Sequence, residues 1–212
     1  DYVFLIDAIL ELLQVRWSNA DLSFALQLAD VVLEHFSDPA GGFYFTATDN
    51  EELLVRQKEV YDGAIPSGNS MAADNFVRLA RLTSDTEYLQ GADQIFATFS
   101  NEANQLPSAH SQLISALQRG IGPSLEVVIA GEPGADDTNT LITTVREMYL
   151  PHAAVLLVPP GESGAAIRRL APFAESYEPV DGKAAAYVCR DFTCQLPTTD
   201  PAKLRELLEE AA

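Results

Sequence analysis

The run DYVFLIDAILELLQVRWSNADLSFALQLADVVLEHF, residues 1–36, decides how the chain begins to fold. In its first half nearly every position is apolar except Asp7, Glu11 and Gln14, which are spaced so that they form one polar stripe along an otherwise buried helix. The second half repeats this design after a two-residue break, with Asn19 as a candidate N-cap. Two mostly apolar helices joined this closely predict an antiparallel hairpin.

Helical spacing returns in three later runs, at residues 67–84, 85–100 and 107–118. Residues 37–66, which precede them, are not helical by pattern. Gly41–Gly42 permits a tight turn there, and Phe43–Thr46 could pair briefly as a strand. Because a long irregular connection inside a compact domain is uncommon, this segment is a place to look for function.

The glycines and the proline of residues 119–124 mark a boundary, after which the sequence period changes. Short apolar runs with strand-like length then alternate with helical patterns, in the order LEVVIAG, DTNTLITTVREMYL, AAVLLVP, AAIRRLAPFAESY, KAAAYVC and PAKLRELLEE. This alternation predicts a small α/β domain with a mostly parallel sheet over residues 121–212, following a helical domain over residues 1–120.

Composition narrows the classes of function. The 212 residues carry 31 acidic and 13 basic side chains, a net charge of -18, which repels nucleic acid and anionic membrane surfaces. No apolar run approaches the roughly 18 residues that cross a bilayer. Two cysteines are too few for a disulfide framework and fit a reducing cytoplasm. The start at Asp1, without an initiator Met, predicts a piece of a longer polypeptide.

Three stretches carry a resemblance to a known family: GGFYFT at residues 41–46, VRQKEVYDGAIPSGNS at residues 55–70 and CRDFTCQLP at residues 189–197. The chain resembles the C-terminal region of the spermatogenesis-associated protein 20 (YyaL-type) family, from DYVFLIDAILELL to CRDFTCQLP. Its most specific part is DGAIPSGNS, residues 62–70.

The resemblance implies an N-terminal thioredoxin-like domain followed by an α/α toroid of the six-hairpin glycosidase type. Both the thioredoxin-like domain and the early toroid hairpins would lie upstream of this chain. With five candidate helices before the boundary, residues 1–120 are expected to form only a partial toroid. Its uncovered apolar faces predict that the chain self-associates through the first hairpin. Light scattering that shows only a monomer at high concentration would contradict this prediction.

The segment EVYDGAIPSGNS, residues 59–70, is the candidate site. Pro66 disfavours helix at Ile65, and Ser67 is suited to cap the helix that follows, whose first backbone N–H groups can bind a hydroxyl or an anion. The ligand-binding candidates are Arg56, Lys58, Tyr61, Ser67, Gly68, Asn69 and Ser70, all carried over from the resemblance except Tyr61, which joins them by position. The alternative is a well-made helix N-terminus with a solvated salt bridge.

Asp62 is the candidate catalytic carboxylate. Glycoside hydrolysis needs a second one about 5–10 Å away, and Asp7, Glu11 and Glu59 are each more typical of structural roles. The partner would then lie upstream, and this piece alone is expected to be inactive. Two hypotheses stay open: a sugar-like or other small polar ligand in a toroid funnel, or a non-catalytic scaffold that supports the thioredoxin-like domain and binds protein partners.

Other motifs are weaker. Gly131–Gly134 matches neither phosphate-loop pattern, and the two aspartates that follow disfavour a nucleotide. The three histidines, His35, His110 and His152, lack metal-ligand spacing, so neither a metal nor a cofactor is predicted. Cys189 and Cys194 are either a redox pair or, as such residues more often are, small buried side chains.

Overall fold

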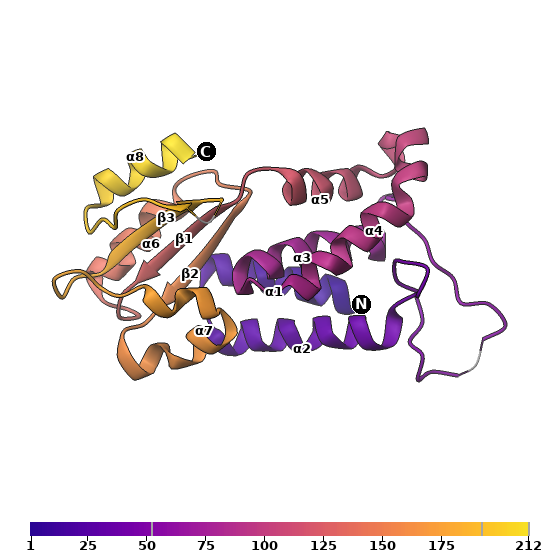
Figure 1. Cartoon of the computed structure of the whole chain (residues 1–212), viewed down its shortest axis with the longest axis horizontal. Coiled ribbons are helices and arrows are strands. Elements are labelled where there is room, and N and C mark those ends of the chain that lie inside the picture. Colours follow the sequence, from indigo (N-terminus) through magenta and orange to yellow (C-terminus); the bar gives the residue numbers. More distant parts are fainter. Residues whose placement is uncertain (52, 192, 212) are drawn as a thin grey trace. The chain divides into compact units, whose positions relative to one another are not determined.

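The computed structural model describes residues 1–51, 53–191 and 193–211. Backbone contacts divide the chain into two compact units (Figure 1). The first, here called the helical unit, comprises Asp1–Ala80 and Asp85–Gly122. The second, the sheet unit, comprises Arg81–Ser84 and Pro123–Ala212.

The helical unit opens with the expected antiparallel hairpin of α1 (Tyr2–Val15) and α2 (Asn19–Phe36), which pack against each other (Figure 1). Ser18, rather than Asn19, is the N-cap of α2, because Ser18 Oγ accepts a hydrogen bond from the Asp21 backbone N–H at 3.2 Å. The Asn19 side chain instead accepts from Trp17 Nε1 at 2.8 Å. The unit continues with α3 (Gly68–Thr83), whose last three residues are counted with the sheet unit, and then with α4 (Thr86–Gln105), the short η1 (Pro107–Ala109) and α5 (Ser111–Ile121).

The polar stripe of α1 binds α3. Arg78 donates to Asp7 Oδ1 at 3.0 Å and lies 2.7 Å from Glu11 Oε1. Asn75 Nδ2 donates to the Val3 carbonyl at 2.6 Å. Burial raises the pKa of Asp7, against the opposing attraction of the Arg78 guanidinium. Asp7 and Glu11, two acids of the polar stripe, therefore bind α3 through ion pairs with Arg78.

The expectation that the rest of α1 is buried is wrong. Five of its apolar side chains are exposed: Tyr2, Phe4, Leu5, Leu12 and Val15. Because α3 covers the polar stripe and α2 covers the neighbouring face, these side chains are left on the remaining surface. The helical unit therefore presents an apolar face along its first helix.

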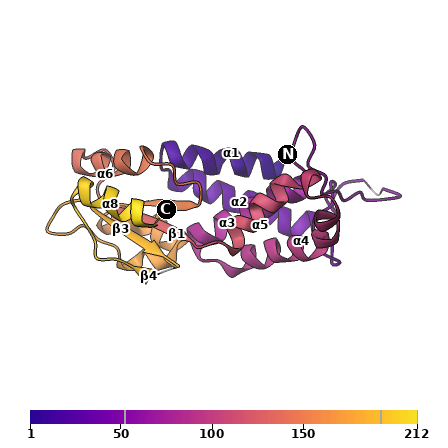
Figure 2. The same cartoon turned by 90° about the horizontal axis from the view of Figure 1, so that it is seen from above.

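The sheet unit contains a four-stranded sheet in the order β2-β1-β3-β4. Its strands are β1 (Leu125–Ala130), β2 (Ala153–Val158), β3 (Ala185–Arg190) and β4 (Thr193–Cys194). Helix α6 (Asp136–Arg146) connects β1 to β2, and α8 (Pro201–Ala211) packs against α6 and β3. Figure 2 shows α6 and α8 on one side of the strands.

The sheet is mixed, so the prediction of a mostly parallel sheet is wrong. Only β1 and β2 are parallel, whereas β3 is antiparallel to both of its neighbours, β1 and β4. Between β2 and β3 the chain passes through η2 (Gly161–Gly164), α7 (Ala165–Leu170) and η3 (Pro172–Ser176). It then turns at Asp181–Gly182, where both φ angles are positive, and enters β3 beside β1 in the opposite direction.

The helices before the boundary are consistent with a toroid but do not define one, because helical hairpins occur in several all-α architectures. The partial toroid therefore stays a prediction. No helix in the described ranges is both long and apolar enough to cross a membrane.

Candidate functional site

The irregular connection between α2 and α3 packs onto α4 through Gly41 and Gly42. Their φ angles are +99° and +75°, a region that favours glycine. A Cβ atom on Gly41 would lie 2.0 Å from Thr98 Oγ1, and one on Gly42 would lie 2.9 Å from the Phe99 ring. Both the backbone conformation and the close approach to α4 therefore require glycine here.

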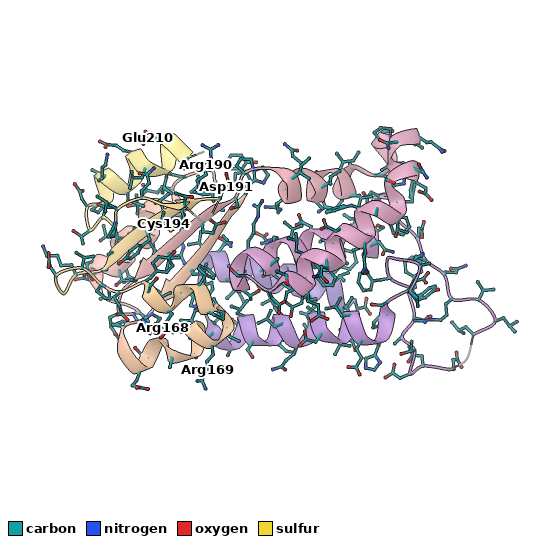
Figure 3. All side chains as sticks on the ribbon, viewed as in Figure 1. Arg168, Arg169, Arg190, Asp191, Cys194 and Glu210 are labelled. Carbon is teal, nitrogen blue, oxygen red and sulfur yellow. A yellow bond between two sulfur atoms is a disulfide. The ribbon has the colours of Figure 1, made fainter. Side chains whose placement is uncertain are left out.

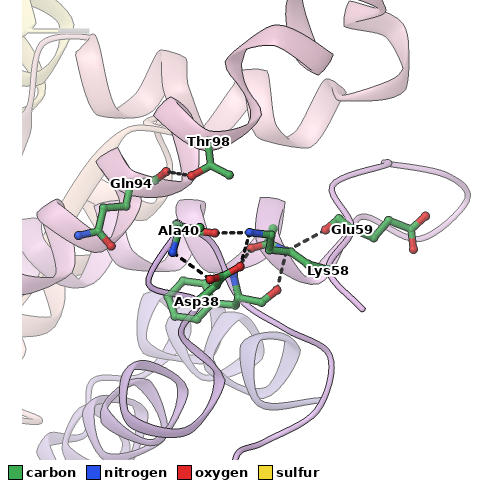
Figure 4. Close-up of polar contacts among 9 residues, drawn as sticks. Asp38, Ala40, Lys58, Glu59, Gln94 and Thr98 are labelled. Atoms are coloured by element: carbon green, nitrogen blue, oxygen red, sulfur yellow. Dashed lines mark hydrogen bonds and ion pairs between the residues drawn. The ribbon is translucent and has the colours of Figure 1, made fainter. Parts of the chain in front are cut away.

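Lys58 fixes this turn from the other end of the connection (Figure 4). Its Nζ donates to Asp38 Oδ2 at 2.7 Å and to the Gly41 carbonyl at 2.6 Å. Hydrogen bonds from Lys58, from the backbone N–H of Ala40 and from the Tyr44 phenol lower the pKa of Asp38 to about 2. Lys58 is thus part of the fold of the connection.

Arg56 lies against the face of Tyr44, with its guanidinium carbon 4.2 Å from the ring centroid. The same guanidinium donates to the carbonyls of His35 and Thr46. Lys58 also lies near this ring, with its Nζ 5.8 Å from the Tyr44 ring centroid. Arg56 and Lys58 therefore both hold Tyr44 in place. Neither residue lines the hollow described below.

Asn69 ties the first turn of α3 to two distant parts of the connection. Its Oδ1 accepts from the Phe43 backbone N–H at 2.7 Å, and its Nδ2 donates to the carbonyls of Phe43 and Glu59 at 3.0 and 2.8 Å. The side chain is buried. Since all of its polar atoms are engaged within the fold, Asn69 serves first as a structural clamp.

Ser67 caps α3, as the sequence predicts. Its Oγ accepts from the Ser70 backbone N–H at 3.0 Å and donates to Ser70 Oγ at 2.8 Å. Both serines are buried. At Gly68, by contrast, an added Cβ would meet nothing within 4 Å, so the first residue of α3 borders open space.

Asp62 accepts three backbone hydrogen bonds. Oδ1 accepts from Ser67 at 2.9 Å, and Oδ2 accepts from Gln112 at 2.8 Å and Leu113 at 3.1 Å. Gln112 and Leu113 belong to the first turn of α5, so the carboxylate caps that helix from a distance. This geometry favours the capping alternative, and the catalytic role of Asp62 stays a prediction.

A hollow of about 90 Å³ lies beside the start of α3. Gly68 and Asn69 contribute to its lining, together with Asp1, Tyr2, Val3, Val32, Phe36, Phe43, Tyr44 and Phe45. Aromatic rings thus face a helix N-terminus, the combination of apolar walls and a few polar groups that is typical of small-molecule sites.

Two of the candidate ligand-binding residues, Gly68 and Asn69, reach this hollow, and the others do not line it. Tyr61 is 57% exposed on the surface. The aromatic lining was not predicted from the sequence, although GGFYFT supplies three of its rings. Tyr2 and Phe36, whose ring centroids lie 5.5 Å apart, come from the first hairpin.

The Lys58–Asp38 ion pair predicts a specific acid response. The lowered pKa of Asp38 contributes stability above its ordinary value of 3.8, and this contribution is lost as the pH falls from 3.8 towards 2. Lys58→Met removes the largest cause of the lowering, so stability should depend less steeply on pH in that range. Urea unfolding between pH 2 and 6 measures how the free energy of unfolding depends on pH, with Lys183→Met, at an exposed position, as the control. If this free energy changed equally steeply with pH in the wild type and in Lys58→Met, the prediction would be wrong.

Cys189 and Cys194 are joined by a disulfide between β3 and β4. Cys189 is buried but Cys194 is exposed, so the interpretation as two small buried side chains does not hold for Cys194. Among the residues that the structure describes, no group of three or more His, Cys, Asp or Glu side chains is arranged to hold a metal ion.

Together these features define a protein of helical hairpins followed by a mixed α/β unit, with an aromatic hollow at a helix start. Its sequence is 32% identical to mouse spermatogenesis-associated protein 20 over 212 residues and 33% identical to the human protein over 210 residues. A Caenorhabditis elegans relative, uncharacterized protein B0495.5, is 28% identical over 214 residues. The resemblance to the spermatogenesis-associated protein 20 family is therefore confirmed along this region.

The mouse and human matches cover 99% and 98% of the chain. The chain spans only 27% of the length of each of these relatives. No family model matches the chain.

Proposed function

We propose that the helical unit binds a small polar, sugar-like ligand in the aromatic hollow beside α3. The observation that carries this proposal is the lining: aromatic rings on the walls and the first residues of a helix at one side. Aromatic faces pack against the apolar faces of sugar rings, and helix N-termini attract hydroxyl oxygens and anions. At about 90 Å³ the hollow suits a single small group, not a drug-sized molecule.

We also propose an architecture and a location for the intact protein. In the intact protein the helical unit would be part of a six-hairpin glycosidase-like toroid, with a thioredoxin-like domain upstream and a cytoplasmic location. Hydrolysis of a sugar would need a second carboxylate beside Asp62. Asp7 and Glu11 both lie against Arg78, so neither is offered as that partner. The proposal for this chain is therefore binding.

A thermal-shift screen of monosaccharides, polyols and phosphosugars tests the ligand proposal. A ligand at 100 times its Kd should stabilise the chain by about 2.7 kcal/mol, which raises the Tm by about 2–4 °C per kcal/mol. The shift should be lost in Gly68→Leu, because a side chain at that position extends into open space beside the hollow.

Phe45→Leu and Phe24→Leu form a matched pair for the same screen. The two phenylalanines are exposed to the same degree, 48% and 47%, but only Phe45 lines the hollow. The ligand shift should fall in Phe45→Leu and persist in Phe24→Leu. No shift with any compound, or an unchanged shift in Gly68→Leu, would count against the proposed site.

A second candidate function is a non-catalytic scaffold. The exposed apolar side chains of α1 favour it, since contiguous apolar surface of this kind marks an interaction face. Contact of this face with a second copy, or with other parts of the intact protein, would bury it. This candidate predicts no ligand shift in the screen above.

A further inference from the structure

We propose that Cys189 and Cys194 form a reversible dithiol–disulfide pair that exchanges with an external dithiol, with Glu126 as the proton donor and acceptor for the buried sulfur. This site lies in the sheet unit and is independent of the ligand proposed for the helical unit. Cys194, on the β4 edge of the sheet, is labelled in Figure 3.

The sheet register places the three residues in one row. Glu126 of β1 lies opposite Cys189 of β3, and Cys189 lies opposite Cys194 of β4. Both pairings are antiparallel, so directly opposed side chains project from the same face with Cβ atoms about 4.5–5.5 Å apart. A carboxyl group therefore lies beside the buried sulfur of the disulfide.

Glu126 is otherwise unexplained by the fold. The residue is 1% exposed, and in the described part of the chain neither Oε1 nor Oε2 has a hydrogen-bond partner. Burying a carboxyl group without a partner is costly. Unsatisfied buried groups of this kind are often found where they take part in catalysis or redox chemistry.

Tyr177 completes the cluster. Its hydroxyl lies 3.1 Å from Cys194 Sγ and 3.6 Å from Cys189 Sγ. Burial raises the pKa of Tyr177, so the phenol stays protonated and can donate to a thiolate. The Tyr177 ring lies 4.7 Å from that of Tyr187, whose hydroxyl donates to the Glu178 carbonyl at 2.7 Å.

The difference in burial sets the order of events. An external thiolate reaches the exposed Cys194, bonds to its Sγ and breaks the disulfide, and the electron pair stays on Cys189 Sγ, which takes a proton from the Glu126 carboxyl. The second thiol of the reagent then attacks the mixed disulfide. Cys194 leaves as a thiolate that accepts a hydrogen bond from the Tyr177 hydroxyl. Solvent then protonates the Cys194 thiolate and the Glu126 carboxylate. The external dithiol loses two electrons and two protons and becomes a disulfide.

The first test compares Glu126→Gln with Glu132→Gln, which makes the same substitution at an exposed position. The native 212-residue chain is reduced with dithiothreitol, and free thiols are labelled with a maleimide and counted by mass. Because general acid catalysis contributes typically 10²–10⁴-fold, Glu126→Gln should slow the reduction at least about tenfold, and Glu132→Gln should not. Equal rates in all three chains, or reduction only in denaturant, would overturn the proposal.

The second test does not depend on Glu126→Gln folding. The chain has two cysteines, so each Cys→Ser variant leaves one thiol. With an aromatic disulfide reagent, Cys194 in Cys189→Ser should react at least about tenfold faster than Cys189 in Cys194→Ser. Tyr177→Phe should slow the reaction of Cys194, since the thiolate loses its donor. Similar reactivity of the two thiols and no effect of Tyr177→Phe would refute the assigned roles.

Discussion

Asp62→Ala is expected to lower the free energy of unfolding by about 3–5 kcal/mol. The carboxylate accepts hydrogen bonds from the backbone of Ser67, Gln112 and Leu113 in a buried setting. Hydrogen bonds to a charged group each contribute about 1.5–3 kcal/mol, and their sum is less than additive. Removing them leaves three backbone N–H groups, those of the buried Ser67 and Leu113 and the half-buried Gln112, unsatisfied at the starts of two helices.

Urea unfolding of Asp62→Ala measures this loss, with Asp93→Ala as the control because Asp93 is exposed on α4. Asp62→Asn should also destabilise, since its amide NH₂ would face backbone donors. A loss below about 1 kcal/mol for Asp62→Ala would show that the cap is dispensable. It would also reopen the catalytic interpretation of Asp62, because a residue held for chemistry alone can be replaced without this cost.

Glu126→Met is expected to raise the free energy of unfolding by about 1–3 kcal/mol. Met has a similar shape, and it removes a buried carboxyl group whose oxygens find no partner among the described residues. The neighbours on either strand, Ala154 and Cys189, are small enough to accept it. Denaturant unfolding of the oxidised chain checks the prediction, with Glu132→Met as the control.

A loss of more than 1 kcal/mol in Glu126→Met would mean that the carboxylate stabilises the sheet unit. A gain in stability together with slower thiol exchange would instead show the trade-off that is typical of functional sites, where a residue that weakens the fold is kept for its chemistry.

The first hairpin was predictable because its signal is local. Apolar residues recur with helical period through residues 1–36, and the break between the helices is short. The burial of α1 was not predictable in the same way. Asp7 and Glu11 pair with Arg78, 71 positions from Asp7 in the sequence, so the polar stripe faces a neighbour. Periodicity alone does not tell which face a neighbouring helix covers.

Strand direction was not predictable either. Apart from Glu126 and Arg190, the runs that form β1, β2 and β3 are mostly apolar, which indicates burial on both faces but carries no information on whether neighbours run parallel. β3 follows the turn at Asp181–Gly182 and runs antiparallel to β1, a pairing between segments far apart in the sequence. Likewise the spacing of Cys189 and Cys194 fits a short hairpin, yet only the pairing of β3 with β4 places the sulfurs together.

In the candidate site, the cap of α3 was predictable from the sequence, but the partners of Asp62 and the lining of the hollow were not. Ser67 caps α3 as Pro66 and the serine-rich run indicate. Two of the three backbone partners of Asp62 lie 50 and 51 positions away, so its capping of α5 depends on tertiary structure. The hollow likewise combines rings from α1, α2 and the connection.

The clamp at Asn69 links the opening of the hollow to the fraying of a helix. Phe43, which lines the hollow, donates its backbone N–H to a side chain that is in place only when the first turn of α3 is formed. Amide hydrogen exchange at Phe43 should therefore report the same opening event as exchange in that first turn, although the two lie 26 residues apart. Any ligand that enters by displacing Phe43 would have to wait for the start of α3 to unwind, so its rate of entry would follow the local stability of the helix.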